Sequence, residues 1–118
     1  MGVRRVVPDV RTGSEEAMAA GRRFYRTLGL EEVMDLGWVV TLASPANPTA
    51  QVTLITRDES AGTVPDMSIE VDDVDAVYAA VVASGARIVH PLRDEEWGVR
   101  RFFAEDPNGR VVNVVSHR

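Results

Sequence analysis

The stretch that decides the fold lies near the end of the chain and holds a tight turn between two apolar segments. It reads Trp97-Gly98-Val99-Arg100-Arg101-Phe102-Phe103-Ala104-Glu105-Asp106-Pro107-Asn108-Gly109-Arg110-Val111-Val112-Asn113-Val114-Val115. Proline presets φ at the second turn position and glycine accepts a positive φ at the fourth, so residues 106–109 are typical of a type I turn that closes into a bulge. The turn predicts a β-hairpin in which Asp106 pairs with Arg110.

The predicted register decides which side chains share a face of this hairpin. It sets Phe103 opposite Asn113 and Arg101 opposite Val115, and neighbours within each strand alternate between the two faces. The residues gathered on one face are Trp97, Val99, Arg101, Phe103, Val111, Asn113 and Val115. A face with tryptophan, arginine, phenylalanine and asparagine is a poor hydrophobic core, so we expect a binding surface here.

Composition narrows the class of protein. The chain has 118 residues, of which 45% are hydrophobic and 26% charged, and this fits one soluble globular domain. A formal net charge of −5 opposes binding to nucleic-acid phosphates. The absence of cysteine excludes disulfides and thiolate metal ligands, and it leaves His90 and His117 as the imidazoles. No apolar run has the length of a membrane span or a signal peptide, so we expect a cytoplasmic protein that binds neither membrane nor nucleic acid.

Hydrophobic periodicity and turn residues predict two helices among eight strands. The first helix is capped by Ser14 and ended by Gly29, and the second is capped by Asp72 or Asp73 and ended by Gly85. The expected strands cover residues 4–10, 30–35, 38–44, 51–57, 67–71, 87–92, 99–104 and 110–116.

The same order of elements therefore occurs twice. The fold class is predicted to be α+β, with one domain over residues 1–118 that contains a βαβββ module at residues 1–57, a linker at residues 58–66 and a second βαβββ module at residues 67–118. We infer a duplicated module from the order of elements and from the matched glycines that end the helices.

Three segments carry a family resemblance over essentially the whole chain. They are Phe24-Tyr25-Arg26-Thr27-Leu28-Gly29-Leu30, Glu70-Val71-Asp72-Asp73-Val74-Asp75-Ala76, and the stretch from Trp97-Gly98 through Asp106-Pro107-Asn108-Gly109. In this order they resemble the vicinal-oxygen-chelate superfamily, which includes glyoxalase I, extradiol dioxygenases, fosfomycin-resistance enzymes and bleomycin-resistance proteins. The resemblance implies a curved mixed sheet whose paired modules enclose a cup for metal and substrate. Two chains commonly form a dimer in this superfamily, so we expect a homodimer that completes the cups.

Metal-dependent members of this superfamily place ligands on the first strand, on the strand that opens the second module, and on the last strand. Those positions hold Arg5, Asp66 and Asn113 in this chain. An arginine brings a competing positive charge and an asparagine offers only a weak carbonyl, so one carboxylate makes no divalent-metal site. Residues 51–56 also lack the glutamate that glyoxalase-like members add. We therefore expect no metal and no other cofactor.

What remains is similar to the bleomycin-resistance side of the superfamily, whose metal-free cups bind a drug and sequester it. This resemblance implies binding of a small aromatic molecule, cationic or uncharged, as in antibiotic resistance. The expected ligand-binding residues are Trp97, Arg101, Phe103, Asn113, Asp66 and Trp38. The aromatic rings would supply flat apolar surface, and Arg101 and Asn113 would orient the ligand through hydrogen bonds. Asp66, Glu95 and Glu96 would attract a cationic group near the rim.

Other interpretations stay open. Trp97 is also typical of packing between modules, Arg101 of a salt bridge, and Asn113 of a structural hydrogen bond. In the alternative function the chain is a lyase, isomerase or oxidoreductase of the superfamily. It is then a metal-free enzyme that uses His90, Asp66 and Arg101 as acid, base and anion clamp, or a metalloenzyme with ligands elsewhere. A third possibility is a dimerisation or partner-binding module whose cup is filled by its own side chains.

The remaining aromatic and imidazole side chains are expected to be structural. Phe24 and Tyr25 lie on the first predicted helix, where core packing is the expectation, as it is for Leu28. His90 lies before a proline at a predicted strand end, and His117 is expected to have no role.

Overall fold

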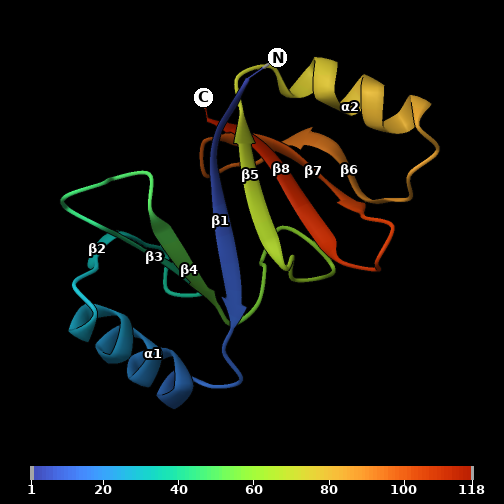
Figure 1. The fold of residues 1–118 in the computed structure, drawn as a ribbon. Helices are drawn as coiled ribbons and strands as arrows, with labels where there is room; N and C mark the ends of the chain where they lie inside the picture. The colour runs from blue at the N-terminus through green and yellow to red at the C-terminus, as the bar shows by residue number, and fades with distance from the viewer. Residues whose placement is uncertain (1, 118) are drawn as a thin grey trace. The chain divides into compact units, whose positions relative to one another are not determined.

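The computed structural model describes residues 2–117, which form two compact units. We call residues 7–64 the N-terminal unit, and residues 2–6 together with residues 65–117 the C-terminal unit. Strand β1 (Val3–Arg11) contributes its first half to the C-terminal unit and its second half to the N-terminal unit (Figure 1). The element order is βαβββ followed by βαβββ, so the predicted α+β fold class is confirmed.

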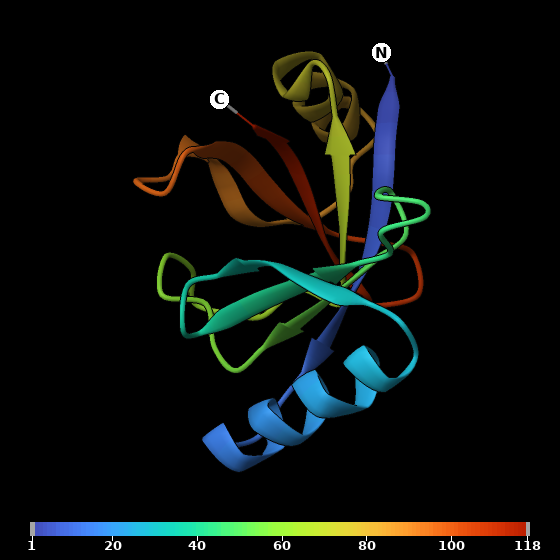
Figure 2. The same ribbon diagram turned by 90° about the vertical axis from the view of Figure 1, so that its left-hand side faces the viewer.

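The N-terminal unit holds a mixed set of strands in the order β2-β3-β4-β1. Its remaining elements are α1 (Glu15–Thr27), β2 (Glu31–Asp35), β3 (Val39–Ala43) and β4 (Gln51–Ile55). Strand β3 is antiparallel to β2 and to β4, whereas β1 runs parallel to β4. Helix α1 lies along one side of these strands (Figure 2), where Met18 packs against Val40, Leu42 and Leu54.

Two expectations for the first helix are wrong. Phe24 and Leu28 are 59% and 65% exposed, although helical spacing predicts both in the core. Met18 and Tyr25 form the packed side of the helix, whereas Phe24 lies off that side and Leu28 follows the last helical residue, Thr27. Ser14 caps the helix as predicted, because its hydroxyl accepts a hydrogen bond from the Ala17 N–H at 3.0 Å.

The C-terminal unit repeats the arrangement with strand order β1-β5-β8-β7-β6. Its elements are β5 (Met67–Val71), α2 (Val74–Ala83), β6 (Ile88–Asp94), β7 (Val99–Glu105) and β8 (Val111–His117). Strand β5 runs parallel to β8, and β7 is antiparallel to both β6 and β8. Asp73 is the cap of α2, with its carboxylate accepting from the Ala76 N–H at 3.1 Å.

The β7–β8 hairpin has the register that the turn predicts. Phe103 pairs with Asn113, and Arg101 pairs with Val115. The Asp106 N–H donates to the Arg110 carbonyl at 2.8 Å, and Gly109 adopts a φ of +82°, the left-handed conformation that closes the bulge.

The β6–β7 connection differs from the prediction. Trp97 lies in a turn rather than on strand β7, because Gly98 has a φ of +94° and the Glu95 N–H donates to the Val99 carbonyl at 2.8 Å. His90 lies inside β6 rather than at its end. The strand continues through Pro91 because β6 is the edge strand, where a missing N–H removes no ladder bond.

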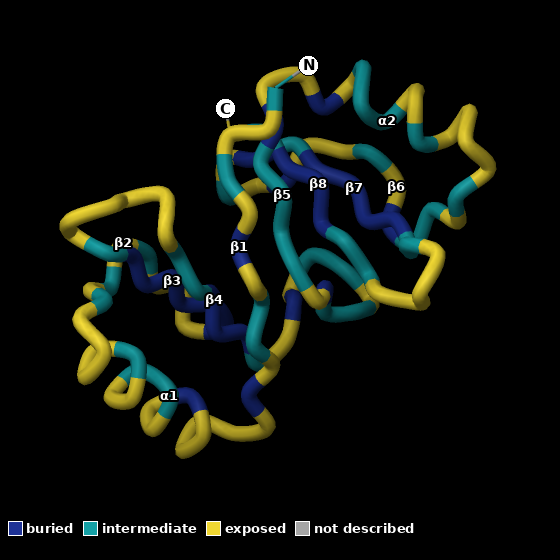
Figure 3. Tube along the Cα trace, in the orientation of Figure 1, coloured by how far each residue is buried: buried dark blue, intermediate teal, exposed yellow. Residues whose placement is uncertain are grey.

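The two faces of β5–β8 are chemically different. Phe102, Ala104 and Val114 point toward α2 and form the core of the unit with Val71 and Val74. The alternate residues of β7 and β8 point away from α2, yet most of them are also buried (Figure 3). Within residues 2–117, no helix is both long enough and apolar enough to span a membrane.

Candidate functional site

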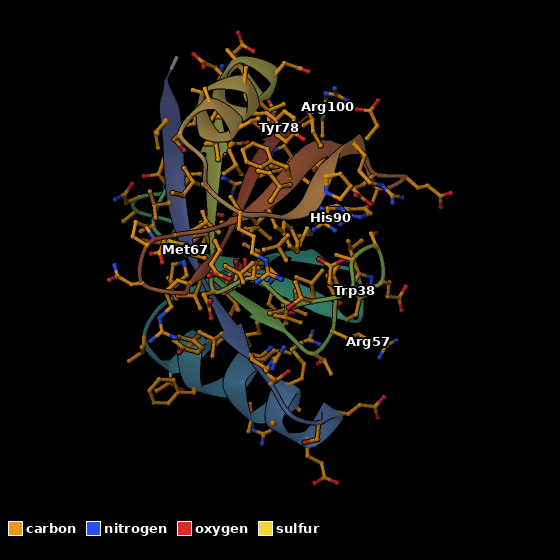
Figure 4. All side chains as sticks on the ribbon, turned by 90° about the vertical axis from the view of Figure 1, so that its right-hand side faces the viewer. Trp38, Arg57, Met67, Tyr78, His90 and Arg100 are labelled. Carbon is orange, nitrogen blue, oxygen red and sulfur yellow. The ribbon has the colours of Figure 1, made fainter. Side chains whose placement is uncertain are left out.

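The face of the C-terminal unit that points away from α2 gathers most of the predicted site residues. Strand alternation and register assign to it Ser68, Glu70, His90, Val99, Arg101, Phe103, Asn113, Val115 and His117. We call this the α2-distal face. The labelled Tyr78 and His90 in Figure 4 mark the two sides, since Tyr78 packs on Phe102 and His90 packs on Phe103.

Arg101 is the centre of this face and is held between two aromatic rings. Its guanidinium carbon lies 5.0 Å from the centre of the Trp97 ring and 4.7 Å from the centre of the Phe103 ring. Only 2% of Arg101 and none of Phe103 is exposed, whereas Trp97 is partly exposed. A planar cation between two rings gains cation–π attraction, which is strongest where water is excluded. The structure therefore brings Trp97, Arg101 and Phe103 together, with Trp97 as the accessible member.

Glu95 supplies the negative charge beside Arg101, which sequence reasoning missed. Its Oε1 lies 2.9 Å from His90 Nε2, 3.3 Å from Arg93 Nε and 3.6 Å from Arg101 Nε. The Glu95 side chain is 1% exposed, so the expectation of a carboxylate near an open rim is wrong for this residue. A carboxylate only accepts hydrogen bonds, so the His90 Nε2–H is the donor.

Asn113 lies opposite Phe103 and beside Ser68, and it is 6% exposed. Its Nδ2 donates to the Ser68 hydroxyl at 3.0 Å. Its Oδ1 is buried and has no hydrogen-bond partner within the described residues. A buried amide oxygen without a donor costs about 1–3 kcal/mol, so this atom is a candidate acceptor for a bound molecule.

The two remaining predicted site residues are Asp66 and Trp38. Asp66 is exposed at the start of β5, and its carboxylate accepts from the Val111 N–H at 2.8 Å. Trp38 belongs to the N-terminal unit, where it is buried and lines a hollow of about 400 Å³ with Thr56 and Arg57.

A second polar cluster lies at the end of the α2-distal face. Glu70 contacts Arg5 Nε through Oε1 at 3.1 Å and the His117 Nδ1 through Oε2. Arg5 Nη2 also lies 3.4 Å from His117 Nε2. His117, expected to have no role, is therefore part of an ordered network.

The residues at the expected metal-ligand positions do not fit a divalent ion. Arg5 is engaged with Glu70, Asp66 with a backbone N–H, and the amide of Asn113 with Ser68. Between residues 2 and 117, no three His, Cys, Asp or Glu side chains converge closely enough to hold a metal. The donor set thus offers a guanidinium, a carboxylate that is already bound and an amide, which is a poor combination for any divalent cation.

The contact between Glu95 and His90 could not be predicted from the sequence, for a physical reason. Glu95 meets His90 because β6 carries register irregularities on both sides of His90, and the turn at residues 95–99 folds the chain back. Simple alternation cannot anticipate such bulges. The contact of Glu70 with His117 was also missed, because it depends on the parallel pairing of β5 with β8, which the sequence analysis does not predict.

Comparisons with known proteins agree with the fold. The model of the Glyoxalase/Bleomycin resistance protein/Dioxygenase superfamily matches residues 16–114. No curated protein matches this sequence.

Several solved structures share the fold. Methylmalonyl-CoA epimerase from Mycobacterium tuberculosis has a TM-score of 0.67 and 21% identity over 99% of this chain and 88% of that chain. A glyoxalase/bleomycin resistance protein/dioxygenase superfamily member from Vibrio splendidus has a TM-score of 0.65 and 19% identity over 98% of this chain and 99% of that chain. The Mn(II)-bound glyoxalase from Novosphingobium aromaticivorans has a TM-score of 0.63 and 24% identity over 97% of this chain but 38% of that chain. Identities this low establish the fold alone, and together with the family match they show that the chain belongs to the glyoxalase/bleomycin resistance protein/dioxygenase superfamily.

Proposed function

We propose that this chain binds a small planar molecule on the α2-distal face of the C-terminal unit without the help of a metal ion. The observation that carries the proposal is the Oδ1 atom of Asn113, a buried acceptor that lacks a donor within the described residues. A ligand with an N–H or O–H group would satisfy that atom and recover the cost of its burial.

Trp97 and Arg101 supply the second part of the argument. The Trp97 ring is partly exposed, and the guanidinium carbon of Arg101 lies 5.0 Å from the centre of the ring. A ring held in place before binding loses little entropy when a planar ligand stacks on it. The ligand class is therefore an aromatic molecule with a hydrogen-bond donor at its edge.

The net charge of the ligand matters less in this proposal than its shape. Glu95 is already surrounded by His90, Arg93 and Arg101, so its charge is largely compensated. We therefore propose that the ligand is recognised by stacking on Trp97 and by donating a hydrogen bond to Asn113, and that a positive charge on the ligand is not required. Sequestration of an aromatic antibiotic is one biological use of such a site.

The test compares aminoacridine with acridine, which lacks the amino donor. Binding is followed by quenching of Trp97 fluorescence in a Trp38→Phe background, so that one tryptophan reports. We expect tighter binding of aminoacridine and loss of that preference in Asn113→Leu. Equal affinity for the two compounds in the parent protein would contradict the proposal. Bleomycin, titrated in parallel, tests the extension to drug sequestration.

The alternative enzyme functions receive less support from the geometry. A metal-dependent reaction lacks a fitting donor set at Arg5, Asp66 and Asn113. For the metal-free version, the His90 side chain is only 9% exposed and that of Arg101 only 2%, so neither is accessible to a substrate, and the Asp66 carboxylate accepts from a backbone N–H. No observation at these residues favours proton transfer.

A further inference from the structure

The cluster of Arg5, Glu70 and His117 has the arrangement of an oriented imidazole base. Both groups that contact the imidazole are largely covered, since the side chains of Arg5 and Glu70 are 23% and 17% exposed. The imidazole itself is 51% exposed. An accessible histidine held by a covered carboxylate is the pairing that orients general bases in many active sites.

The contacts fix which nitrogen carries the proton. A carboxylate is acceptor-only, so Glu70 requires the N–H of His117 to be on Nδ1. In the neutral ring the lone pair is then on Nε2, which faces Arg5 Nη2 at 3.4 Å. This contact is long for a hydrogen bond, so a bound substrate that approaches Nε2 displaces only a weak interaction.

Arg5 adds a positive charge beside the accepting nitrogen. Its Nε is engaged with Glu70 at 3.1 Å, which leaves the guanidinium Nη2 directed at the imidazole. An anion formed by loss of a proton to Nε2 would therefore arise next to a guanidinium. Such a preplaced charge stabilises the transition state of proton transfer.

We propose that His117 is a general base for small planar acids, with Glu70 as its positioning residue and Arg5 as the group that stabilises the anion formed. The proposal goes beyond ligand binding at Trp97 and Asn113, because it concerns proton transfer at a different set of side chains. The acid to be deprotonated is a neutral molecule with an acidic C–H bond, and its anion has an oxygen that Arg5 can reach.

The probe is nitrobenzisoxazole, whose ring opens when a base removes its C–H proton. The C–H bond breaks and an N–H bond forms at His117 Nε2. The electron pair of the C–H bond completes a nitrile as the ring N–O bond breaks, and the oxygen leaves as a coloured phenolate. No oxidant, reductant or other reactant is needed, and the imidazolium returns its proton to buffer.

We expect the protein to accelerate this reaction about a hundredfold over the same concentration of free imidazole at the same pH. His117→Gln should remove the acceleration. Glu70→Gln should lower kcat with little change in KM, and Glu70→Asp should restore part of the loss. Glu59→Gln, an exposed change in the N-terminal unit, is the matched control and should leave the rate unchanged.

A spectroscopic readout separates positioning from a purely structural role. In the nitrogen-15 NMR spectrum of the neutral ring, His117 should carry its proton on Nδ1 in the parent protein and lose that preference in Glu70→Gln, with circular dichroism unchanged. The proposal is overturned by an absent acceleration, by an acceleration that survives in His117→Gln, or by a proton found on Nε2. Each outcome is independent of the acridine titration, because the probe and the residues differ.

Discussion

The Nε atom of Arg101 lies 3.6 Å from Oε1 of Glu95, and the two side chains are only 2% and 1% exposed. An ion pair this deeply buried gains its attraction at the expense of desolvating both charges. Arg101 contacts the Glu95 carboxylate and the Trp97 ring at the same time, because its guanidinium carbon lies 5.0 Å from the centre of that ring. The stability of the pair therefore affects both folding and the proposed ligand site.

Removal of Glu95 should destabilise the protein strongly. In Glu95→Ala the buried Arg101 loses its nearest negative charge, and breaking such a pair costs about 3–5 kcal/mol. The adjacent Glu96 is exposed, so Glu96→Ala is the control and should change the free energy of unfolding by less than about 0.5 kcal/mol. Urea denaturation measures both, and equal stabilities for the two variants would show that the pair contributes nothing.

Truncation of Trp97 should weaken ligand binding and leave the fold intact. Trp97 lies in a turn and is partly exposed, so Trp97→Ala removes stacking surface without opening the core. We expect a loss of about 1–3 kcal/mol in the affinity for aminoacridine, measured by isothermal titration calorimetry. Trp38→Phe, in the N-terminal unit, serves as the comparison. A larger loss in Trp38→Phe than in Trp97→Ala would move the site to the other unit.

The β7–β8 hairpin was predictable from the sequence, whereas the contact of Glu95 with His90 was not. The hairpin was predictable because its turn depends only on residues 106–109. Proline and glycine determine the turn type, and the turn determines that Phe103 pairs with Asn113. The contact between His90 and Glu95 depends instead on irregular pairing of an edge strand, which no local pattern encodes. Phe24 was expected in the core with Tyr25, but neighbouring helical residues point in different directions, and Tyr25 is the one that packs on the sheet.

Acid should destabilise the N-terminal unit through Glu32. A hydrogen bond from Arg22 Nε at 2.9 Å is the main cause that lowers the pKa of Glu32 below its ordinary value of about 4.3. A lowered pKa in the folded state means that the stabilisation is complete above about pH 4.3 and is lost as the pH falls through the folded-state pKa.

Unfolding by urea at several pH values tests this dependence. Glu32→Gln should flatten the decline in stability below about pH 4.3, whereas the exposed Glu31→Gln should retain it. An unchanged decline in Glu32→Gln would assign the acid sensitivity to other carboxylates.

We expect the chain to form a homodimer in solution. Val3 and Val6 of β1 are 64% and 54% exposed, and apolar strand residues that face water favour association. Sedimentation should give a mass about twice the 12.9 kDa of the single chain at micromolar concentration. The substitution Val6→Lys should lower the dimer fraction if β1 lies at the interface, with Arg4→Lys as the control. A monomer throughout the concentration range would refute the dimer.

Some of the residues of the candidate site could be predicted from the sequence. Arg101, Phe103 and Asn113 share one side of the C-terminal unit because period-two alternation is a geometric property of strands, and Trp97 reaches Arg101 from the neighbouring turn. Their burial could not be predicted from the sequence, because the exposure of a side chain depends on contacts between segments that are distant in the sequence. Trp38 was grouped with them on its aromatic character alone, and the structure puts it in the other unit.

The central claim, a metal-independent ligand site at Asn113 and Trp97, is tested most directly by NMR on protein treated with EDTA. The proton–nitrogen spectrum resolves the side-chain amide of Asn113 and the indole N–H of Trp97 during titration with aminoacridine. These two signals should shift together and saturate in the absence of any divalent ion. Signals that stay fixed at saturating aminoacridine, or that move only after a divalent metal is added, would contradict it.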